Sequence, residues 1–383
     1  MKKYTRYSVH LLISALFYVL IFIAFNLLID PYGVINSPRF TFLNLEKPAQ
    51  DNHIRLFKAI DVIHQKPKTI LLGSSRTDVG INAAHLQEIA ASPIYNLALT
   101  GPNIYEVRRY LEHAITNQKN IQQVLLGIDF FMFNGNLKNK DNFNELRLEQ
   151  SNMIGSDLLD ITFSLKTTLD SFKTIHSNLN GVSVPVFLSN GTRNEDYLSL
   201  IKANTLKEFK LSLSKYFESS YLYKNYQLSK KYLKELKNII ILCRKNYINL
   251  NIFISPSHAT QWEVIKRMEL WPIFEQWKRE IIKITPVWDF SGYNSVTTEL
   301  LDKKMNNYWD NSHYTQQVGN LIIKRVFTIS SSEIPQDFGV FLTLDNIDHH
   351  LAKIRKNQIQ WEKSNLKTIE FLDKIQAQVN NNK

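Results

Sequence analysis

Hydrophobic positions divide the chain into an apolar N-terminal run and a long region in which strand-like and helix-like patterns alternate. The first run extends from Leu11 to Ile29 and is almost unbroken. Crossing the core of a bilayer takes about 20 such residues, whereas the apolar part of a cleaved signal has roughly 7–15. The run therefore predicts a transmembrane helix within residues 1–30, with a helix buried in the protein core as the alternative.

Charged residues flank this run asymmetrically. Lys2, Lys3 and Arg6 precede it, Asp30 closes it, and no A-x-A-like cleavage site follows. Positive residues stay on the cytoplasmic side of a membrane, so we expect the N-terminus inside and the rest of the chain outside. In a bacterium this predicts a single-pass protein of the inner (cytoplasmic) membrane with a periplasmic or cell-surface body.

Short apolar runs and helical stripes alternate after a linker at 31–50 that carries several Pro, Asn and Gly residues. Strands alternating with helices of this length are typical of βαβ units. The sequence therefore predicts an α/β fold with about five parallel strands. The expected strands are 68–72, 93–99, 121–129, 248–255 and 286–290, and the expected helices are 51–64, 81–91, 103–115, 228–246, 261–284 and 314–327.

Two parts of the chain fall outside this alternation. Residues 134–225 are too long for an ordinary loop, which predicts a large insertion into a core formed by 51–133 and 226–330. We expect a cap over the carboxyl ends of the strands, where ligands bind in α/β folds. The charged, helical tail at 331–383 packs either on the body or on a partner. The insertion has its own helical stripe of Leu158, Ile161, Leu165, Leu169 and Phe172, and a hairpin-like GVSVPVFLSNGT.

Composition narrows the function classes. A hydrophobic content of 44% supports a substantial core, and the single Cys243 excludes an intramolecular disulfide. No HExxH or CxxC spacing occurs, so neither a metal nor another cofactor is predicted. The net charge of +11 is densest between Lys202 and Lys245. It is either a solvated face or a surface for anionic lipid or acidic glycan, and the lack of a basic-aromatic motif argues against nucleic acid.

Two short motifs carry candidate chemistry. The first expected strand runs into a Gly-Ser-Ser-Arg turn that contains Ser75, and an Asp-x-x-His motif, Asp310 and His313, precedes the last expected helix. A serine needs an imidazole base to become a nucleophile, and the imidazole needs a carboxylate to fix its tautomer. Each motif alone is also typical of a turn or helix cap, but together they predict a nucleophile, a base and an orienting carboxylate.

The motifs resemble those of the SGNH, or GDSL-type, hydrolase superfamily, whose first block is Gly-Asp-Ser and whose last is Asp-x-x-His. Here Ser74 replaces the aspartate of the first block. A stretch that ends at Gly101 resembles the block whose glycine offers a backbone N–H to the oxyanion. The resemblance covers about 50–130 and 248–328, and implies a flavodoxin-like three-layer parallel sheet.

One block departs from the family pattern. Asp129 lies where the family has an asparagine that donates a hydrogen bond to the oxyanion. An ionised carboxylate there would repel the charge that it should stabilise. We therefore expect Asp129 to pair with Arg76 and the backbone N–H groups of Ser75 and Gly101 to form the oxyanion hole, so that Asp129→Asn preserves or raises activity. The alternative is that Asp129 caps the following loop.

Two further side chains follow expected strands. His258 comes after the strand at 248–255 and is a candidate substrate contact. Asp289 ends the strand at 286–290, where it either binds substrate hydroxyls or holds a loop. Both lie at the predicted ligand-binding edge of the sheet.

Within the superfamily, a Gly-Ser-Ser block with one N-terminal anchor resembles the envelope transferases, which include the alginate O-acetylation proteins and the D-alanyl transfer protein of teichoic acids. The resemblance implies a membrane-anchored O-acyl(acetyl)transferase that acts on a cell-surface polysaccharide, with a membrane acyl-donor protein as a partner. Two alternatives are an esterase that hydrolyses acyl esters, and a catalytically inactive glycan-binding or scaffold protein.

Overall fold

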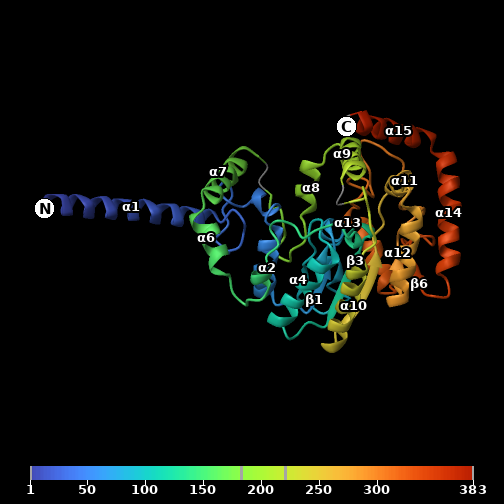
Figure 1. The fold of residues 1–383 in the computed structure, drawn as a ribbon, viewed down its shortest axis with the longest axis horizontal. Helices are drawn as coiled ribbons and strands as arrows, with labels where there is room; N and C mark the ends of the chain where they lie inside the picture. The colour runs from blue at the N-terminus through green and yellow to red at the C-terminus, as the bar shows by residue number, and fades with distance from the viewer. Residues whose placement is uncertain (1, 182–183, 220–221, 382–383) are drawn as a thin grey trace.

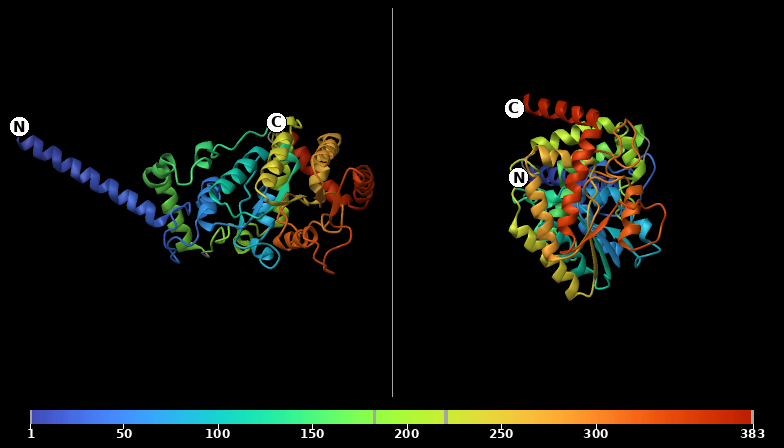
Figure 2. Two further views of the ribbon diagram at one scale, coloured as in Figure 1. Left: turned by 90° about the horizontal axis from the view of Figure 1, so that it is seen from below. Right: turned by 90° about the vertical axis from the view of Figure 1, so that its right-hand side faces the viewer.

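The computed structural model describes residues 2–181, 184–219 and 222–381 and begins with one long helix. This helix, α1 (Lys2–Ile29), projects from the body along most of its length (Figures 1 and 2). From Leu11 onward its exposed side chains are almost all apolar, which is the pattern of a helix that faces lipid. Among the described residues it is the one helix long and apolar enough to cross a membrane.

A mixed six-stranded sheet forms the centre of the body. The strand order is β2-β1-β3-β4-β5-β6, and all neighbours are parallel except the last pair. The strands are β1 (Thr69–Leu72), β2 (Ile94–Asn96), β3 (Gln123–Ile128), β4 (Asn249–Ile254), β5 (Val287–Asp289) and β6 (Val340–Leu342). The first five coincide with expected strands.

Helices cover the sheet. Next to one another along one face lie α2 (Ile54–Gln65), α4 (Ile104–Asn117), α10 (Lys230–Lys245) and α12 (Trp271–Ile284). The short α3 (Ser75–Gly80) packs against α13 (Gln316–Val326), and right-handed crossovers place this pair on the opposite face. Most residues of the parallel strands are therefore buried on both faces, which explains why these strands are mainly apolar.

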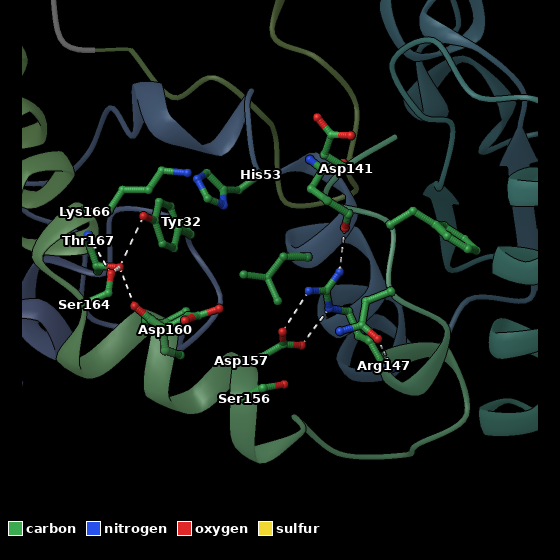
Figure 3. Close-up of a pocket in the computed structure, with 15 residues that line it drawn as sticks. Tyr32, His53, Asp141, Arg147, Ser156, Asp157, Asp160, Ser164, Lys166 and Thr167 are labelled. Carbon is green, nitrogen blue, oxygen red and sulfur yellow. Dashed lines mark hydrogen bonds and ion pairs between the residues drawn. The ribbon is translucent and has the colours of Figure 1, made fainter. Parts of the chain in front are cut away.

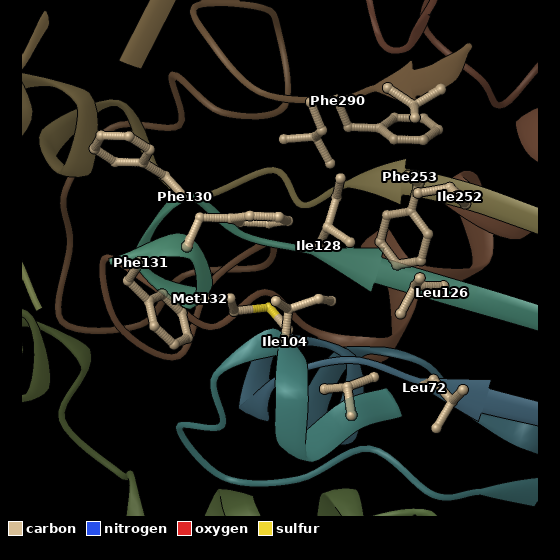
Figure 4. Close-up of a cluster of buried hydrophobic side chains, with 14 of the residues drawn as sticks. Leu72, Ile104, Leu126, Ile128, Phe130, Phe131, Met132, Ile252, Phe253 and Phe290 are labelled. Atoms are coloured by element: carbon tan, nitrogen blue, oxygen red, sulfur yellow. The ribbon is translucent and has the colours of Figure 1, made fainter. Parts of the chain in front are cut away.

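Aromatic side chains fill the core beside the carboxyl end of β3. The chain leaves this strand through a short 3₁₀ turn, η3 (Phe130–Phe133), whose four residues are all buried. Phe130 stacks on Tyr226 at a centroid distance of 4.0 Å and contacts Trp277. Figure 4 shows Phe130 to Met132 packed next to Leu126, Ile128 and Ile104. This packing fixes the edge of the sheet at which the candidate site lies.

Three sequence-based expectations about elements are wrong. The predicted helix 81–91 is instead a 3₁₀ turn, η2 (Ala83–Leu86). The preceding α3 ends at Gly80, where a Cβ would lie 2.0 Å from Tyr314 and where Gly319 of α13 packs directly against the Gly80 carbonyl oxygen. The predicted helix 261–284 is two helices, α11 (Ala259–Arg267) and α12, with Glu269 at a φ of 59° between them. The antiparallel β6 arises in the tail that the sequence predicts as helical.

The segment between β3 and α10 divides into two groups of helices. The first group contains α5 (Glu145–Leu148), which contacts α4, and α6 (Gly155–Phe163) and α7 (Leu165–Asn180), which contact α1 directly (Figure 1). Farther along are α8 (Glu195–Ile201) and α9 (Thr205–Glu218), and α9 packs against α11. Val182 and Ser183 of the expected hairpin lie outside the described residues, and within the rest Phe187 bridges to Arg193.

The linker and the tail both belong to the body. In the linker Tyr32, Val34 and Lys47 are buried, so residues 31–50 pack as ordered turns rather than as a free tether. The tail contains α14 (Ile347–Ser364) and α15 (Leu366–Asn381), which pack against α12 and α9 respectively.

Candidate active site

Ser75 lies at the carboxyl end of β1, at the first position of α3. Gly73 turns the chain there with a φ of 148°, and a Cβ at this position would lie 2.8 Å from the carbonyl oxygen of Gly127. The Ser74 hydroxyl then accepts a hydrogen bond from the Arg76 N–H at 3.1 Å and caps the helix. The strand, the glycine and the cap together fix the position of the Ser75 hydroxyl.

Asp310 and His313 share a tight turn just before α13. One oxygen of Asp310, Oδ1, accepts from the backbone N–H of Ser312 at 2.8 Å and of His313 at 2.9 Å. The Trp309 N–H donates to the His313 carbonyl oxygen at 2.9 Å and closes the turn. Both side chains therefore lie on the same side of the turn, as the three-residue spacing predicts.

The turn brings the three predicted side chains together in a hydrogen-bonded chain. The distance from Ser75 Oγ to His313 Nε2 is 2.9 Å, and His313 Nδ1 lies 2.8 Å from Asp310 Oδ2. A carboxylate only accepts, so Nδ1 carries the imidazole proton and Nε2 accepts from the serine hydroxyl. Serine, imidazole and carboxylate thus follow in the order that serine activation requires.

Lys202 completes the surroundings of Asp310. Its Nζ donates to Asp310 Oδ2 at 2.6 Å from the end of α8. Burial alone would raise the pKa of Asp310, but the charges of His313 and Lys202 outweigh burial and hold that pKa well below its ordinary value. Asp310 is therefore ionised at neutral pH and can stabilise a protonated His313.

Arg76 and Asp129 form a buried pair behind Ser75, as the sequence predicts. Arg76 Nη1 donates to Asp129 Oδ1 at 2.8 Å, and the Ser74 hydroxyl donates to Asp129 Oδ2 at 2.5 Å. Burial lowers the pKa of Arg76, and the carboxylate of Asp129 outweighs this effect and raises it well above its ordinary value. Arg76 also reaches the hydroxyl groups of Ser312 at 3.0 Å and Tyr216 at 3.2 Å.

Gly101 lies in a turn beside the Ser75 segment. The Leu99 N–H donates to the Gly73 carbonyl oxygen at 3.1 Å, which sets this turn against the end of β1. Gly101 has a φ of 57°, in the left-handed region that glycine adopts without strain. Within the described part of the chain, the N–H groups of Ser75 and Gly101 donate to no protein acceptor. Both remain available to a ligand oxygen.

Two other candidates are not part of this cluster. His258 is fully buried, where its Nδ1 accepts from the Thr260 N–H at 3.2 Å and its Nε2 donates to the Glu299 carbonyl oxygen at 2.7 Å. Asp289 is buried with Lys278 at 2.6 Å. With these partners neither side chain is open to a substrate, so both hold the fold, and the expectation of substrate contacts is not retained.

The structure has one cavity next to the candidate site and another farther from it. One of about 330 Å³ is lined by Thr100, Arg55, Lys140 and Asn142, next to the Gly101 turn. Another of about 470 Å³ lies between α6 and residues 141–147, and Figure 3 shows Arg147 paired with Asp157 across from Tyr32 and His53. The two share Asp141 and Asn142. Across the described residues, no group of three or more His, Cys, Asp or Glu is placed to bind a metal.

Sequence reasoning missed two side chains of the site. Lys202 and Tyr216 come from the segment between β3 and α10. In the sequence, both precede the residues that they contact in the Asp310–His313 turn by more than 90 positions. Lys202 borders the densest basic stretch, but nothing in that pattern indicates a carboxylate partner. Tyr216 belongs to an ordinary amphipathic helix, so no local signal distinguishes it.

The geometry defines a serine whose hydroxyl is bonded to an oriented imidazole. Within the described residues the backbone N–H groups of Ser75 and Gly101 have no protein acceptor, and the buried carboxylate of Asp129 has its charge compensated by Arg76. No protein-family model and no curated protein matches this chain in sequence. The chemistry of the site is therefore argued from the arrangement of its own residues.

Proposed function

We propose that the protein is a membrane-anchored serine acyl-ester enzyme in which Ser75 is the nucleophile, His313 the base and Asp310 the orienting carboxylate. The observation that carries the proposal is the hydrogen-bonded chain from Ser75 Oγ through His313 to Asp310, at 2.9 Å and 2.8 Å. His313 is about one-fifth exposed, so a substrate can reach the reacting atoms.

In the acylation step Ser75 Oγ bonds to the carbonyl carbon of an ester or thioester while His313 Nε2 takes the hydroxyl proton. The tetrahedral intermediate collapses as the bond to the leaving group breaks and that group takes the proton from His313. In the second step His313 takes a proton from an incoming hydroxyl, which attacks the acyl-serine; the bond between the acyl carbon and Ser75 Oγ then breaks, and His313 returns the proton to Ser75 Oγ. Water as the acceptor makes the enzyme an esterase, and a sugar hydroxyl makes it an O-acyltransferase.

The N–H groups of Ser75 and Gly101 are the proposed oxyanion donors. Preorganised donors of this kind contribute on the order of 10²–10³-fold in rate each. Asp129 can lie nearby without repelling the oxyanion because Arg76 and Ser74 occupy its oxygens. The aspartate therefore does not exclude activity, and this favours an enzyme over an inactive scaffold protein.

Three features support the transferase branch of the SGNH-like superfamily. The order β2-β1-β3-β4-β5 is that of a flavodoxin-like sheet. The long α1 suits an anchored enzyme with its body outside a bacterial inner membrane. The hollow beside Thr100, lined by polar and charged groups, offers room for a glycan acceptor near the oxyanion donors. An accompanying membrane protein would deliver the acyl group.

The test is a p-nitrophenyl acetate assay on the full chain in detergent, with a fluorophosphonate probe and intact mass measured in parallel. Ser75→Ala should lower turnover at least about 10³-fold and abolish labelling. Ser291→Ala, which removes a buried serine outside the site, is the matched control and should be labelled like the wild type. Adding oligosaccharide acceptors then separates transfer from hydrolysis by the appearance of an acylated sugar.

An absence of labelling in folded wild type would contradict the proposal. The same conclusion follows if Ser291→Ala and Ser75→Ala lose activity equally. In either case a glycan-binding or scaffold function becomes the better account, and binding of the same oligosaccharides by calorimetry would be the next measurement.

A further inference from the structure

An exposed apolar face lies on the two helices that contact the end of α1. Its residues are 48–71% exposed. Single leucines such as Leu300 are equally exposed elsewhere in the body, but here six apolar side chains lie on two neighbouring helices, as in a contiguous patch. The sequence pattern predicts several of them as an internal stripe, but only Ile161 of that stripe is buried. We define the α6–α7 face by Leu158, Leu159, Phe163, Leu165, Leu169 and Phe172.

The α6–α7 face continues the apolar surface of α1. Phe172 contacts Phe25 of α1 with ring centroids 5.0 Å apart. Figures 1 and 2 show α6 and α7 beside the end of α1 where it enters the body. The apolar surface of α1 and the α6–α7 face are therefore continuous, so that lipid surrounding α1 can also reach the face.

Asn26 ties the two helices to α1 through a fully satisfied amide. Its Nδ2 donates to the Thr162 carbonyl oxygen and to Thr168 Oγ1, both at 3.0 Å, and its Oδ1 accepts from Ser171 at 3.0 Å. An unpartnered amide in hydrocarbon would cost several kcal/mol. The partners of Asn26 come from the end of α6 and from the first half of α7, so these parts of the two helices lie at the depth of Asn26.

The length of α1 gives that depth. At about 1.5 Å per residue, the apolar run from Leu11 to Ile29 rises about 28 Å, close to the roughly 30 Å of a bilayer core. Asn26 is three residues from its end, which places it about 5 Å inside the hydrocarbon. Two to three residues farther along, at the end of the run, Asn44 donates to the Leu28 carbonyl oxygen and Lys47 to that of Ile29. These bonds satisfy the end of α1 without an aqueous turn.

We propose that the α6–α7 face is embedded in the outer part of the bilayer, so that the protein is held by a transmembrane helix and by a helix pair that enters one leaflet. The occupant of the face is lipid acyl chain. This inference rests on the anchoring role of α1 proposed above and is independent of the chemistry at Ser75. Amphipathic helices at this depth bury their apolar side about 5–10 Å into the interface.

The test uses single cysteines labelled with an environment-sensitive fluorophore on the full chain in lipid nanodiscs. Cys243 is buried and is replaced by alanine to leave one reactive site. Leu169→Cys probes the face, Leu20→Cys in α1 is the positive control, and Leu366→Cys is the negative control. Leu366 is 65% exposed and is the first residue of α15, which lies on the side of the body away from α1 (Figure 1). Quenching by nitroxide-labelled lipid and by aqueous iodide is measured for each.

Lipid nitroxide should quench most of the fluorescence at Leu169 and Leu20, and iodide should quench only Leu366. Quenching of Leu169 by iodide alone, with Leu20 quenched by lipid, would overturn the inference while leaving the anchor intact. Quenching of Leu169 by neither would mean that protein covers the face, which also overturns it. Quenching of Leu20 by iodide would overturn the anchor itself.

Discussion

Two clusters in the body combine the same four side-chain types, yet only one has the arrangement of a reactive serine. Each contains a buried aspartate bonded to a histidine and a lysine, with a serine close by. They differ in which group lies between the others. The members are Ser75, His313, Asp310 and Lys202 in the first cluster, and Ser291, His350, Asp289 and Lys278 in the second.

In the second cluster the aspartate occupies the central position. The Ser291 hydroxyl donates to Asp289 Oδ1 at 2.6 Å, and His350 Nε2 lies 2.9 Å from Asp289 Oδ2. No imidazole accepts the serine proton, and Lys278 donates to the serine oxygen at 2.7 Å. Ser291 therefore gains no nucleophilic character, and the cluster ties α14 and α12 to the end of β5. Connectivity, rather than composition, distinguishes a candidate catalytic group from a structural one.

The largest expected effect comes from the same substitution in both clusters. Asp310→Asn should lower kcat about 10³–10⁴-fold, because an amide cannot hold the imidazole tautomer or stabilise its charge. Asp289→Asn should leave kcat unchanged and lower the free energy of unfolding by about 3 kcal/mol, because Lys278 and His350 lose their carboxylate. The measurements are ester turnover and urea unfolding of both variants. Comparable kcat losses in the two would remove the distinction.

Asp129→Asn is expected to have the next largest effect, on stability. The substitution leaves the fully buried Arg76 without its carboxylate, and an arginine cannot lose its proton to relieve the cost. The free energy of unfolding should fall by about 3–5 kcal/mol. The sequence-based expectation is that Asp129→Asn preserves or raises activity. With the loss of stability included, we expect this only of the Asp129→Asn molecules that remain folded.

The double variant Arg76→Gln/Asp129→Asn is the control. Removal of both charges should recover part of the lost stability, measured by urea unfolding as a double-mutant cycle. An Asp129→Asn protein as stable as the wild type would contradict the buried pair.

The sequence predicts the local and periodic parts of this molecule well. Each of the five parallel strands is short and mainly apolar, and Ser75, Asp310 and His313 lie in motifs beside strand or helix ends that the topology brings to one edge. What it does not predict depends on long-range packing. The break at Glu269, the 3₁₀ turn after Gly80 and the contact of Lys202 with Asp310 each follow from neighbours distant in the chain.

A moderate effect is expected from His258 as pH falls. Because its Nδ1 accepts a backbone N–H, the ring must stay neutral, and burial lowers its pKa from 6.5 to about 4. Between these two values the unfolded chain binds a proton that the folded chain does not, so stability is lost as pH falls through this window. Across this pH window the free energy of unfolding should fall by about 3 kcal/mol because of His258.

His258→Asn tests this account because asparagine can still cap α11 but does not titrate. Thermal unfolding of the variant between pH 7 and pH 4.5 should show a smaller fall in Tm than the wild type. Some pH dependence should remain, since burial also lowers the pKa of His53 and His113. Equal slopes for variant and wild type would rule out His258 as a source of the acid sensitivity.

The smallest expected effect comes from substitution of Lys202, the lysine of the Ser75 cluster that corresponds to Lys278 in the second cluster. Lys278 is wholly buried, whereas Lys202 is 17% exposed and holds Asp310 Oδ2 at 2.6 Å from a different part of the chain. Lys202→Met should lower kcat about 5–10-fold, because Asp310 loses one charged donor but keeps His313 and two backbone N–H groups. Lys202→Arg should restore most of this loss, and Lys210→Met, an exposed lysine on α9, should cause none. A Lys202→Met enzyme with wild-type kcat would reduce this contact to a surface ion pair, whereas a loss as large as that of Asp310→Asn would mean that the ammonium, not the imidazole, fixes the carboxylate.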